Sequence, residues 1–150
     1  MIGESLASVL LYRLLIALAI VLAGVALYRL LHNLTLARAR AVRPRPGAAR
    51  APGLETARPG LPVLLYFTTP TCAPCKTVQR PAIQRLQENL GEGLEVVEVD
   101  AAGQPEIASQ WGVLSVPTTF LIDAQGNPRY VNHGVAPLEK LQRQYAKLIS

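Results

Sequence analysis

The sequence predicts an α/β domain with the element order β-α-β-α-β-β-α over residues 61–150, preceded by one N-terminal transmembrane helix. Two observations predict the domain: short apolar runs typical of strands alternate with segments of helical periodicity, and both cysteines follow directly after a predicted strand. A third observation, a long apolar run near the N-terminus, predicts the membrane helix. A chain of 150 residues has room for one such core with additional segments.

The N-terminal apolar run covers residues 8–28 and contains a single charge, Arg13. As a helix its 21 residues would be about 31 Å long, which matches the hydrocarbon thickness of a bilayer. The tetrapeptide YRLL occurs near each end of the run, so one Tyr-Arg pair falls at each expected interface. We therefore expect residues 1–31 to form a single-pass anchor in the cell membrane, with lipid as its partner.

A cleaved signal peptide is the alternative interpretation of the same run. Its uninterrupted apolar part, Leu14 to Leu27, has only 14 residues, and Gly24-Val25-Ala26 offers small residues at a cleavage site. We favour the anchor because apolar residues continue beyond that site. The two interpretations differ in whether the domain stays attached to the membrane.

Residues 32–60 are rich in arginine, proline and alanine and predict a flexible linker. Residues 1–60 contain eight arginines against two glutamates, a net charge of +6, whereas residues 61–150 contain seven Lys/Arg against eight Asp/Glu, a net charge of −1. Most of the arginines follow the apolar run, which predicts a cytoplasmic domain by the positive-inside rule, with an extracytoplasmic domain as the alternative. Because the domain has no basic patch, we expect no nucleic-acid partner.

Apolar periodicity predicts the elements of the domain. The first strand is a continuous apolar run with β-branched and aromatic members, typical of a strand buried on both faces. The first helix contains Pro81, which is expected to kink it. Its predicted inward positions are Val78, Ala82, Ile83, Leu86 and Leu90. In chain order, we expect strand 61–68, helix 75–90, strand 94–100, helix 104–111, a hairpin of strands 117–122 and 129–133, and a final helix that opens at Pro137.

The motif TPTCAPCK holds both cysteines of the chain, Cys72 and Cys75, at the predicted start of a helix. Unpaired amide groups and the positive end of the helix dipole favour a thiolate at Cys72, whereas Cys75 is expected one turn further on and shielded from solvent. Pro74 suits the first turn because its missing N–H has no helical partner to lose. A thiolate can attack a partner's disulfide, and a second thiol nearby can then displace the product. The spacing therefore predicts a redox site.

Two structural roles for the cysteines are less favoured. A purely structural disulfide would close a very small loop and would remove little entropy from the unfolded chain. A zinc site would need four ligands, and the two histidines, His32 and His133, lie far apart in the sequence and do not form a ligand pair. We therefore expect no metal, and the sequence indicates no other cofactor.

The segment FTTPTCAPCK, the element order and the later stretch GVLSVPT resemble the thioredoxin family over residues 61–150. The resemblance implies a thioredoxin-like fold and a protein-disulfide oxidoreductase in which Cys72 attacks and Cys75 resolves. It also implies a cis peptide bond before Pro117, which would shape the substrate site, and pairing of the Val116 backbone with the substrate chain. Protein disulfides would be the substrates, and an electron donor that the sequence does not identify would recycle the enzyme.

The dipeptide between the cysteines, Ala73-Pro74, resembles the Gly-Pro of reducing thioredoxins and is expected to border the substrate, which implies reducing use. Two positions depart from the family: Thr71 replaces the usual tryptophan, and Tyr66 replaces a buried aspartate. Trp111 does not match the missing tryptophan and is expected in the core. The segment before residue 61 is too short to supply the first strand and helix of a full thioredoxin. A non-catalytic binding or scaffold module at the membrane is therefore the alternative function.

Overall fold

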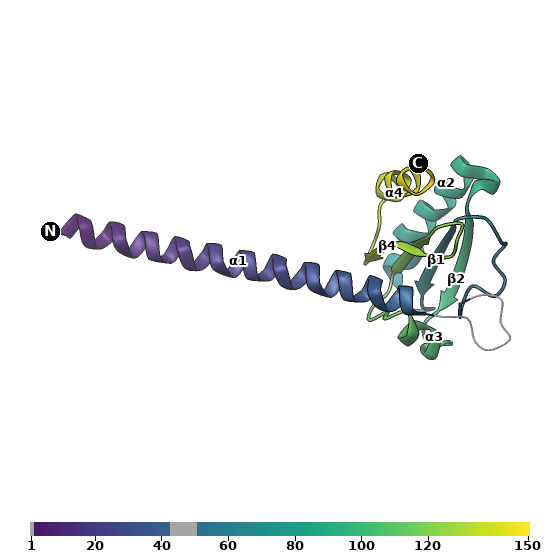
Figure 1. The fold of residues 1–150 in the computed structure, drawn as a ribbon, viewed down its shortest axis with the longest axis horizontal. Coiled ribbons are helices and arrows are strands. Elements are labelled where there is room, and N and C mark those ends of the chain that lie inside the picture. Colours follow the sequence, from purple (N-terminus) through teal and green to yellow (C-terminus); the bar gives the residue numbers. More distant parts are fainter. Residues whose placement is uncertain (1, 43–50) are drawn as a thin grey trace. The chain divides into compact units, whose positions relative to one another are not determined.

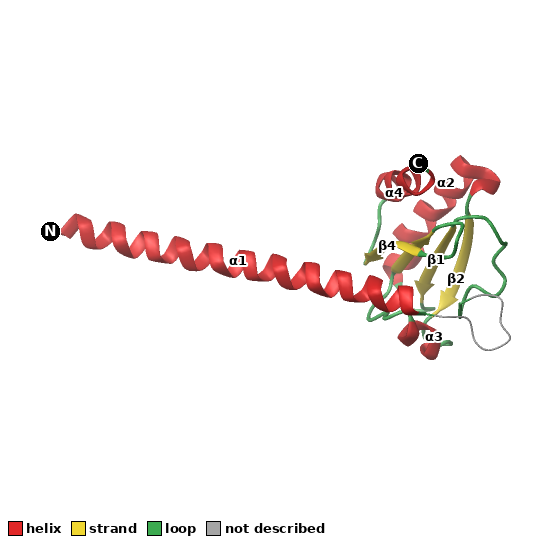
Figure 2. Cartoon of the chain, viewed as in Figure 1, coloured by secondary structure: helices red, strands yellow, loops and turns green. Residues whose placement is uncertain are grey.

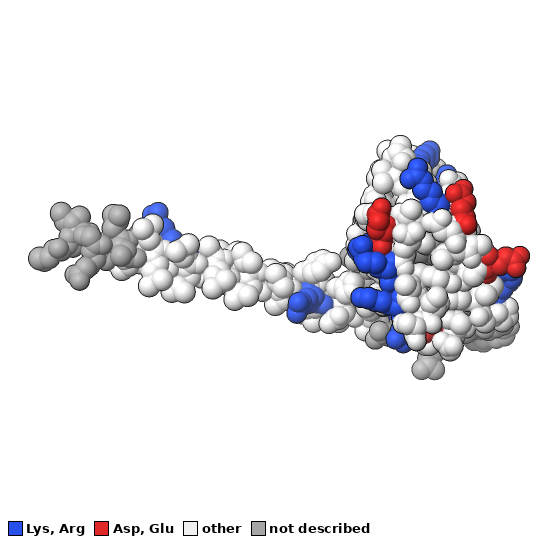
Figure 3. Space-filling model, turned by 90° about the horizontal axis from the view of Figure 1, so that it is seen from above, with Lys and Arg blue, Asp and Glu red and all other residues white. Residues whose placement is uncertain are grey.

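The computed structural model describes residues 2–42 and 51–150. The chain divides into two compact units, Met1–Leu34 and Thr35–Ser150, which are described separately. Helix α1, Ile2–Ala41, begins in the first unit and ends in the second. Among the described residues, Ser8–Ala39 is long and apolar enough to cross a membrane, although a signal sequence would share these properties. Its side chains from residue 8 to residue 34 are largely exposed and uncharged (Figure 3), as expected of a helix that would lie in lipid.

The structure differs from the predicted flexible linker at both of its ends. Helix α1 runs to Ala41 rather than ending near residue 31, and Ala39 is buried in a core cluster of the second unit. On the other side, Leu54 and Ala57 are buried in the same cluster. The central part of the predicted linker, residues 43–50, lies outside the described residues, and the division into anchor, linker and domain stays a prediction.

Within the described residues, four strands form one mixed sheet in the order β2-β1-β3-β4 (Figure 2). The strands are β1, Val63–Thr68; β2, Glu95–Asp100; β3, Thr118–Ile122; and β4, Pro128–His133. Strands β1 and β2 are parallel, and β3 is antiparallel to both β1 and β4. Strand β1 is buried along its whole length, because it is an inner strand covered on both faces.

Helices cover both faces of this sheet (Figure 1). They are the π-helical turn η1, Cys75–Gln79; α2, Arg80–Leu90; the short 3₁₀ turn η2, Gly91–Gly93; α3, Pro105–Gln110; and α4, Leu138–Ile149. Alternate residues of β1 enter two different clusters: Leu65 packs with Ala108 of α3, whereas Leu64 packs with residues of α2 and α4. The predicted α/β fold is confirmed: the described elements of the domain follow the predicted order β-α-β-α-β-β-α.

Trp111 lies in the core, as predicted, and also explains why the segment before β1 is ordered. Its side chain is 1% exposed, and its ring packs against Phe120 with 5.1 Å between ring centroids. The indole Nε1 donates a hydrogen bond to the carbonyl of Pro52 at 2.8 Å. A buried indole N–H needs such an acceptor, so this bond ties the Pro52 segment to the domain.

The first helix of the domain is not the single kinked α-helix that was predicted. A π-helical turn, η1, precedes α2, and Pro81 stands in the first turn of α2. A π turn holds more residues than an α turn, so it rotates the side chains within it relative to the α pattern. The inward prediction for Val78 is therefore wrong: this side chain is 48% exposed, and the neighbouring Gln79 is buried instead.

Candidate active site

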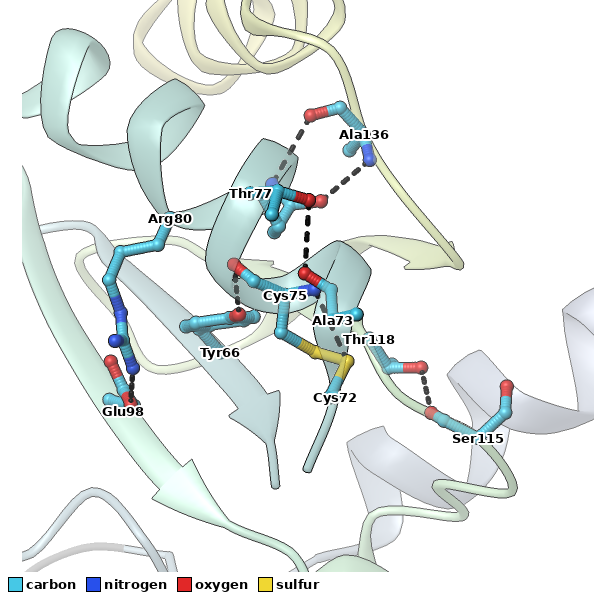
Figure 4. Close-up of a disulfide and its surroundings, with 11 residues drawn as sticks. Tyr66, Cys72, Ala73, Cys75, Thr77, Arg80, Glu98, Ser115, Thr118 and Ala136 are labelled. Atoms are coloured by element: carbon cyan, nitrogen blue, oxygen red, sulfur yellow. Dashed lines mark hydrogen bonds and ion pairs between the residues drawn. A yellow bond between two sulfur atoms is a disulfide. The ribbon is translucent and has the colours of Figure 1, made fainter. Parts of the chain in front are cut away.

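Cys72 and Cys75 are joined by a disulfide, with their Cα atoms 5.3 Å apart (Figure 4). The pair follows the end of β1 by a short turn and leads into η1, so the predicted junction between a strand and a helix is present. The two cysteine residues differ in access, because Cys72 is 8% exposed and Cys75 is 0% exposed. An incoming disulfide can therefore approach Cys72 more readily than Cys75.

Main-chain hydrogen bonds hold the turn that contains the disulfide. The amide of Cys75 donates to Sγ of Cys72 at 3.2 Å, which places an N–H group where it would stabilise a thiolate after reduction. The amide of Cys72 donates to the carbonyl of Thr69 at 3.2 Å, and Thr77 Oγ1 donates to the carbonyl of Ala73 at 3.0 Å. Ala73 and the following Pro74 are exposed beside the disulfide.

The peptide bond between Val116 and Pro117 is cis, in agreement with the expectation for this position. Hydrogen bonds fix the loop around it: Thr118 Oγ1 donates to the carbonyl of Ser115 at 2.8 Å, and the amide of Gly134 donates to the carbonyl of Pro117 at 2.8 Å. Val116 packs against the core cluster that contains both cysteines. The fold therefore brings the cis-proline loop to the disulfide, although the two are separated along the chain.

A groove of about 440 Å³ lies beside the cis-proline loop. Thr69, Val113, Leu114 and Val116 belong to its lining, so it extends from the end of β1 along the loop that precedes Pro117. Leu114 is 90% exposed, an unusual state for a large apolar side chain. Leu114 had no predicted role, because a single leucine in a loop produces no periodic signal.

Tyr66 stands on β1, where its side chain reaches the turn of the disulfide. It is 1% exposed, and its hydroxyl donates a hydrogen bond to the carbonyl of Cys75 at 3.3 Å. Burial raises the pKa of Tyr66 above its ordinary value of 10.0, so the phenol stays neutral at physiological pH. The sequence had identified Tyr66 only as a departure from the family, and this hydrogen bond was not foreseen.

Within residues 2–42 and 51–150, no group of three or more His, Cys, Asp or Glu side chains is placed to hold a metal ion. Among the described residues, no Asp or Glu side chain is buried in the core. The chemistry available at this site is therefore that of the two sulfurs and of the main-chain donors around them.

Comparison with known proteins agrees with the fold. The family model described as Thioredoxin matches residues 55–147, more than half of the chain. Thioredoxin of Bacillus subtilis is 35% identical over 80 residues, which cover 53% of this chain and 75% of the relative. Thioredoxin of Listeria monocytogenes is 34% identical over 87 residues, which cover 58% of this chain and 82% of the relative.

Solved structures also share the fold. The crystal structure of Fasciola hepatica thioredoxin matches with a TM-score of 0.53 and 22% identity, over 60% of this chain and 83% of that one. A thioredoxin-2 described as a component of the malaria parasite protein secretion machinery matches with a TM-score of 0.53 and 22% identity, over 58% of this chain and 82% of that one. With its disulfide-bonded Cys72–Cys75 pair and the matching family model, the chain belongs to the thioredoxin family, whose general activity is thiol-disulfide exchange.

Proposed function

We propose that this protein is a membrane-tethered thiol-disulfide oxidoreductase that reduces disulfides in other proteins, with Cys72 as the attacking thiol and Cys75 as the resolving thiol. The unequal access of the two sulfurs supports this assignment most directly. Cys72 is 8% exposed and receives an N–H hydrogen bond, whereas Cys75 is 0% exposed. A thiolate that is stabilised and partly accessible attacks, and a fully buried neighbour acts only once the substrate is attached.

The exchange consists of two displacement steps that start from the reduced protein. First, the Cys72 thiolate attacks one sulfur of the substrate disulfide, which forms a mixed disulfide and releases the other substrate sulfur as a thiolate. Next, Cys75 loses its proton to solvent and attacks Sγ of Cys72, which restores the Cys72–Cys75 disulfide and releases the reduced substrate. Two electrons pass from the protein to the substrate, and an unidentified donor returns them.

The surface around Cys72 supports a polypeptide substrate. Ala73 and Pro74 are exposed next to the disulfide in the chain, and Val116, which precedes the cis-proline Pro117, packs against the cluster that contains both cysteines. An extended substrate chain would pair with the backbone of Val116 and would place its own disulfide against Cys72. The apolar groove next to this loop offers further contact area.

Replacing Cys75 by serine is expected to trap substrate proteins on Cys72 as mixed disulfides. The first displacement still occurs in this variant, but no thiol remains to release the product. The measurement is non-reducing electrophoresis of the purified full chain, followed by identification of the attached proteins after reduction. The double variant Cys72→Ser/Cys75→Ser is the control and is expected to capture nothing covalently. Partners that bind the Cys75→Ser protein without a covalent bond would instead favour the scaffold function, which the departures at Thr71 and Tyr66 keep open.

The domain is expected to face the cytoplasm. Only some of the arginines that follow the uninterrupted apolar part, Leu14 to Leu27, belong to the described residues. In the sequence these arginines outnumber the single arginine that precedes this part, Arg13. Protease added to intact spheroplasts should leave the domain uncut, and digestion should occur only after the membrane is permeabilised. Digestion in intact spheroplasts would show that the domain faces the opposite side of the membrane. Loss of an N-terminal tag from the mature protein would indicate a cleaved signal peptide.

A further inference from the structure

Tyr66 is a buried polar side chain that the two displacement steps do not use. It belongs to the same core cluster as Cys72 and Cys75, and Figure 4 shows its ring beside Cys75. Its hydroxyl donates to the Cys75 carbonyl at 3.3 Å. The bond therefore acts on the main chain of the resolving cysteine.

The same carbonyl accepts a second hydrogen bond because η1 is a π turn. The amide of Arg80 donates to the Cys75 carbonyl, five residues away, whereas an α-helical turn would use the amide of Gln79. A carbonyl oxygen has two lone pairs, so it can accept both the Arg80 amide and the Tyr66 hydroxyl. Two donors from different elements thus fix the orientation of the Cys75 peptide group.

A side-chain contact links the same residues to the sheet. The Arg80 guanidinium pairs with Oε1 of Glu98 at 2.6 Å, and Glu98 on β2 stands opposite Tyr66 on β1. Both charged side chains are nearly half exposed, so the pair adds little stability by itself. Its geometric effect is to hold Arg80 next to β1, the strand that carries Tyr66. Arg80 is the residue whose amide donates to the Cys75 carbonyl.

The protonation state of Tyr66 fits a donor role. Burial is the main cause that raises its pKa, and the charge of Glu98 acts in the same direction, against a hydrogen bond with Thr68 and the charge of Arg80. A phenol with a pKa above 10.0 is neutral near pH 7, so it donates a proton in a hydrogen bond but does not act as a base there.

We propose that Tyr66 is a positioning residue for the resolving step: its hydroxyl holds the Cys75 carbonyl and so keeps the Cys75 sulfur aimed at Sγ of Cys72 in the mixed disulfide. This inference rests on the proposed roles of the two cysteines. A thiol displacement needs the attacking sulfur in line with the bond that breaks, and a small misplacement of a reacting group lowers its rate strongly. The substitution Tyr66→Phe removes the hydroxyl and leaves the buried ring.

The test follows the reaction of the reduced full chain, in detergent micelles, with 5,5′-dithiobis(2-nitrobenzoate). Attack by Cys72 releases one coloured thiolate and leaves a mixed disulfide, and attack by Cys75 then releases the second. For Tyr66→Phe, the second phase is expected to slow by about two- to tenfold, the effect of losing one hydrogen bond, while the first phase is unchanged. When the rate of the second phase is plotted against pH, the plateau at high pH should be lower than in the wild-type chain, and the midpoint of the curve should be unchanged. This is expected because the substitution changes the geometry of Cys75 and not its ionisation.

Tyr145→Phe is the matched control. Tyr145 is also buried, and its hydroxyl donates to a main-chain carbonyl, that of Gly93, at 3.0 Å, but it does not contact Cys75 in any described bond. Both phases should keep their wild-type rates in this variant. Equal second phases in Tyr66→Phe and Tyr145→Phe would overturn the inference, as would a shifted midpoint with an unchanged plateau. Failure of the wild-type chain to release the second thiolate would instead refute the proposed roles of the cysteines.

Discussion

Replacing Cys72 by serine is expected to abolish the reduction of protein disulfides, with a loss of about 10³-fold or more. A serine hydroxyl does not form a nucleophilic anion near neutral pH, and no other described sulfur can take over the attack. Cys75 is 0% exposed, so it cannot reach the disulfide of a separate protein. The measurement is the reduction of insulin by the full chain, with dithiothreitol as the source of electrons.

The serine variant of the other cysteine is the natural comparison for this prediction. Cys75→Ser is expected to lose turnover as well, yet to keep a wild-type rate for the first displacement in a single turnover. The difference between the two variants follows from the unequal access of the sulfurs in the structure. An equal loss of the first displacement in both variants would contradict the assignment of Cys72 as the attacking thiol.

Sequence periodicity predicted the elements of the domain closely where apolar residues form continuous or strictly spaced sets. The expected strand 61–68 corresponds to β1, which is buried throughout, and the final helix begins directly after Pro137, as predicted. The order of the strands in the sheet cannot be predicted in this way. It depends on pairing between distant segments, so periodicity did not predict it.

The ends of the predicted linker show a limit of the same reasoning. Leu54 and Ala57 are isolated apolar residues among prolines and arginines, so they produce no periodic pattern. They are nevertheless buried, because the segment that carries them closes over the core and supplies the carbonyl of Pro52 to Trp111. Such a long-range hydrogen bond leaves no trace in the local sequence.

At the candidate site, local sequence predicted the residues but not the hydrogen bonds between them. The two-residue spacing of the cysteines was sufficient to identify Cys72 and Cys75 as candidates, whereas Pro117 was identified through the resemblance to the family. The bond from Tyr66 could not be predicted, because it uses a carbonyl whose surroundings are set by a π turn. One additional residue in a helical turn has no clear sequence signal, so the buried position of Gln79 was not predicted either.

Replacing Gln79 by leucine is expected to lower the free energy of unfolding by about 2–6 kcal/mol. Gln79 is fully buried, its Nε2 donates to the carbonyl of Ala136 at 3.2 Å, and its Oε1 accepts from the amide of Ala136 at 2.7 Å. Leucine has a similar size but leaves both main-chain groups without these partners, and each such loss costs about 1–3 kcal/mol. Urea denaturation followed by the fluorescence of Trp111, the single tryptophan of the chain, provides the measurement.

Gln84→Leu is the matched control, because it makes the same chemical change at an exposed position of α2. It is expected to alter the free energy of unfolding by less than about 0.5 kcal/mol. The comparison also tests the π turn itself. If this turn were α-helical in solution, Val78 would face the core and Gln79 would lie closer to solvent. Gln79→Leu would then be as well tolerated as Gln84→Leu, and the hydrogen-bonding scheme that places Cys75 would have to be replaced.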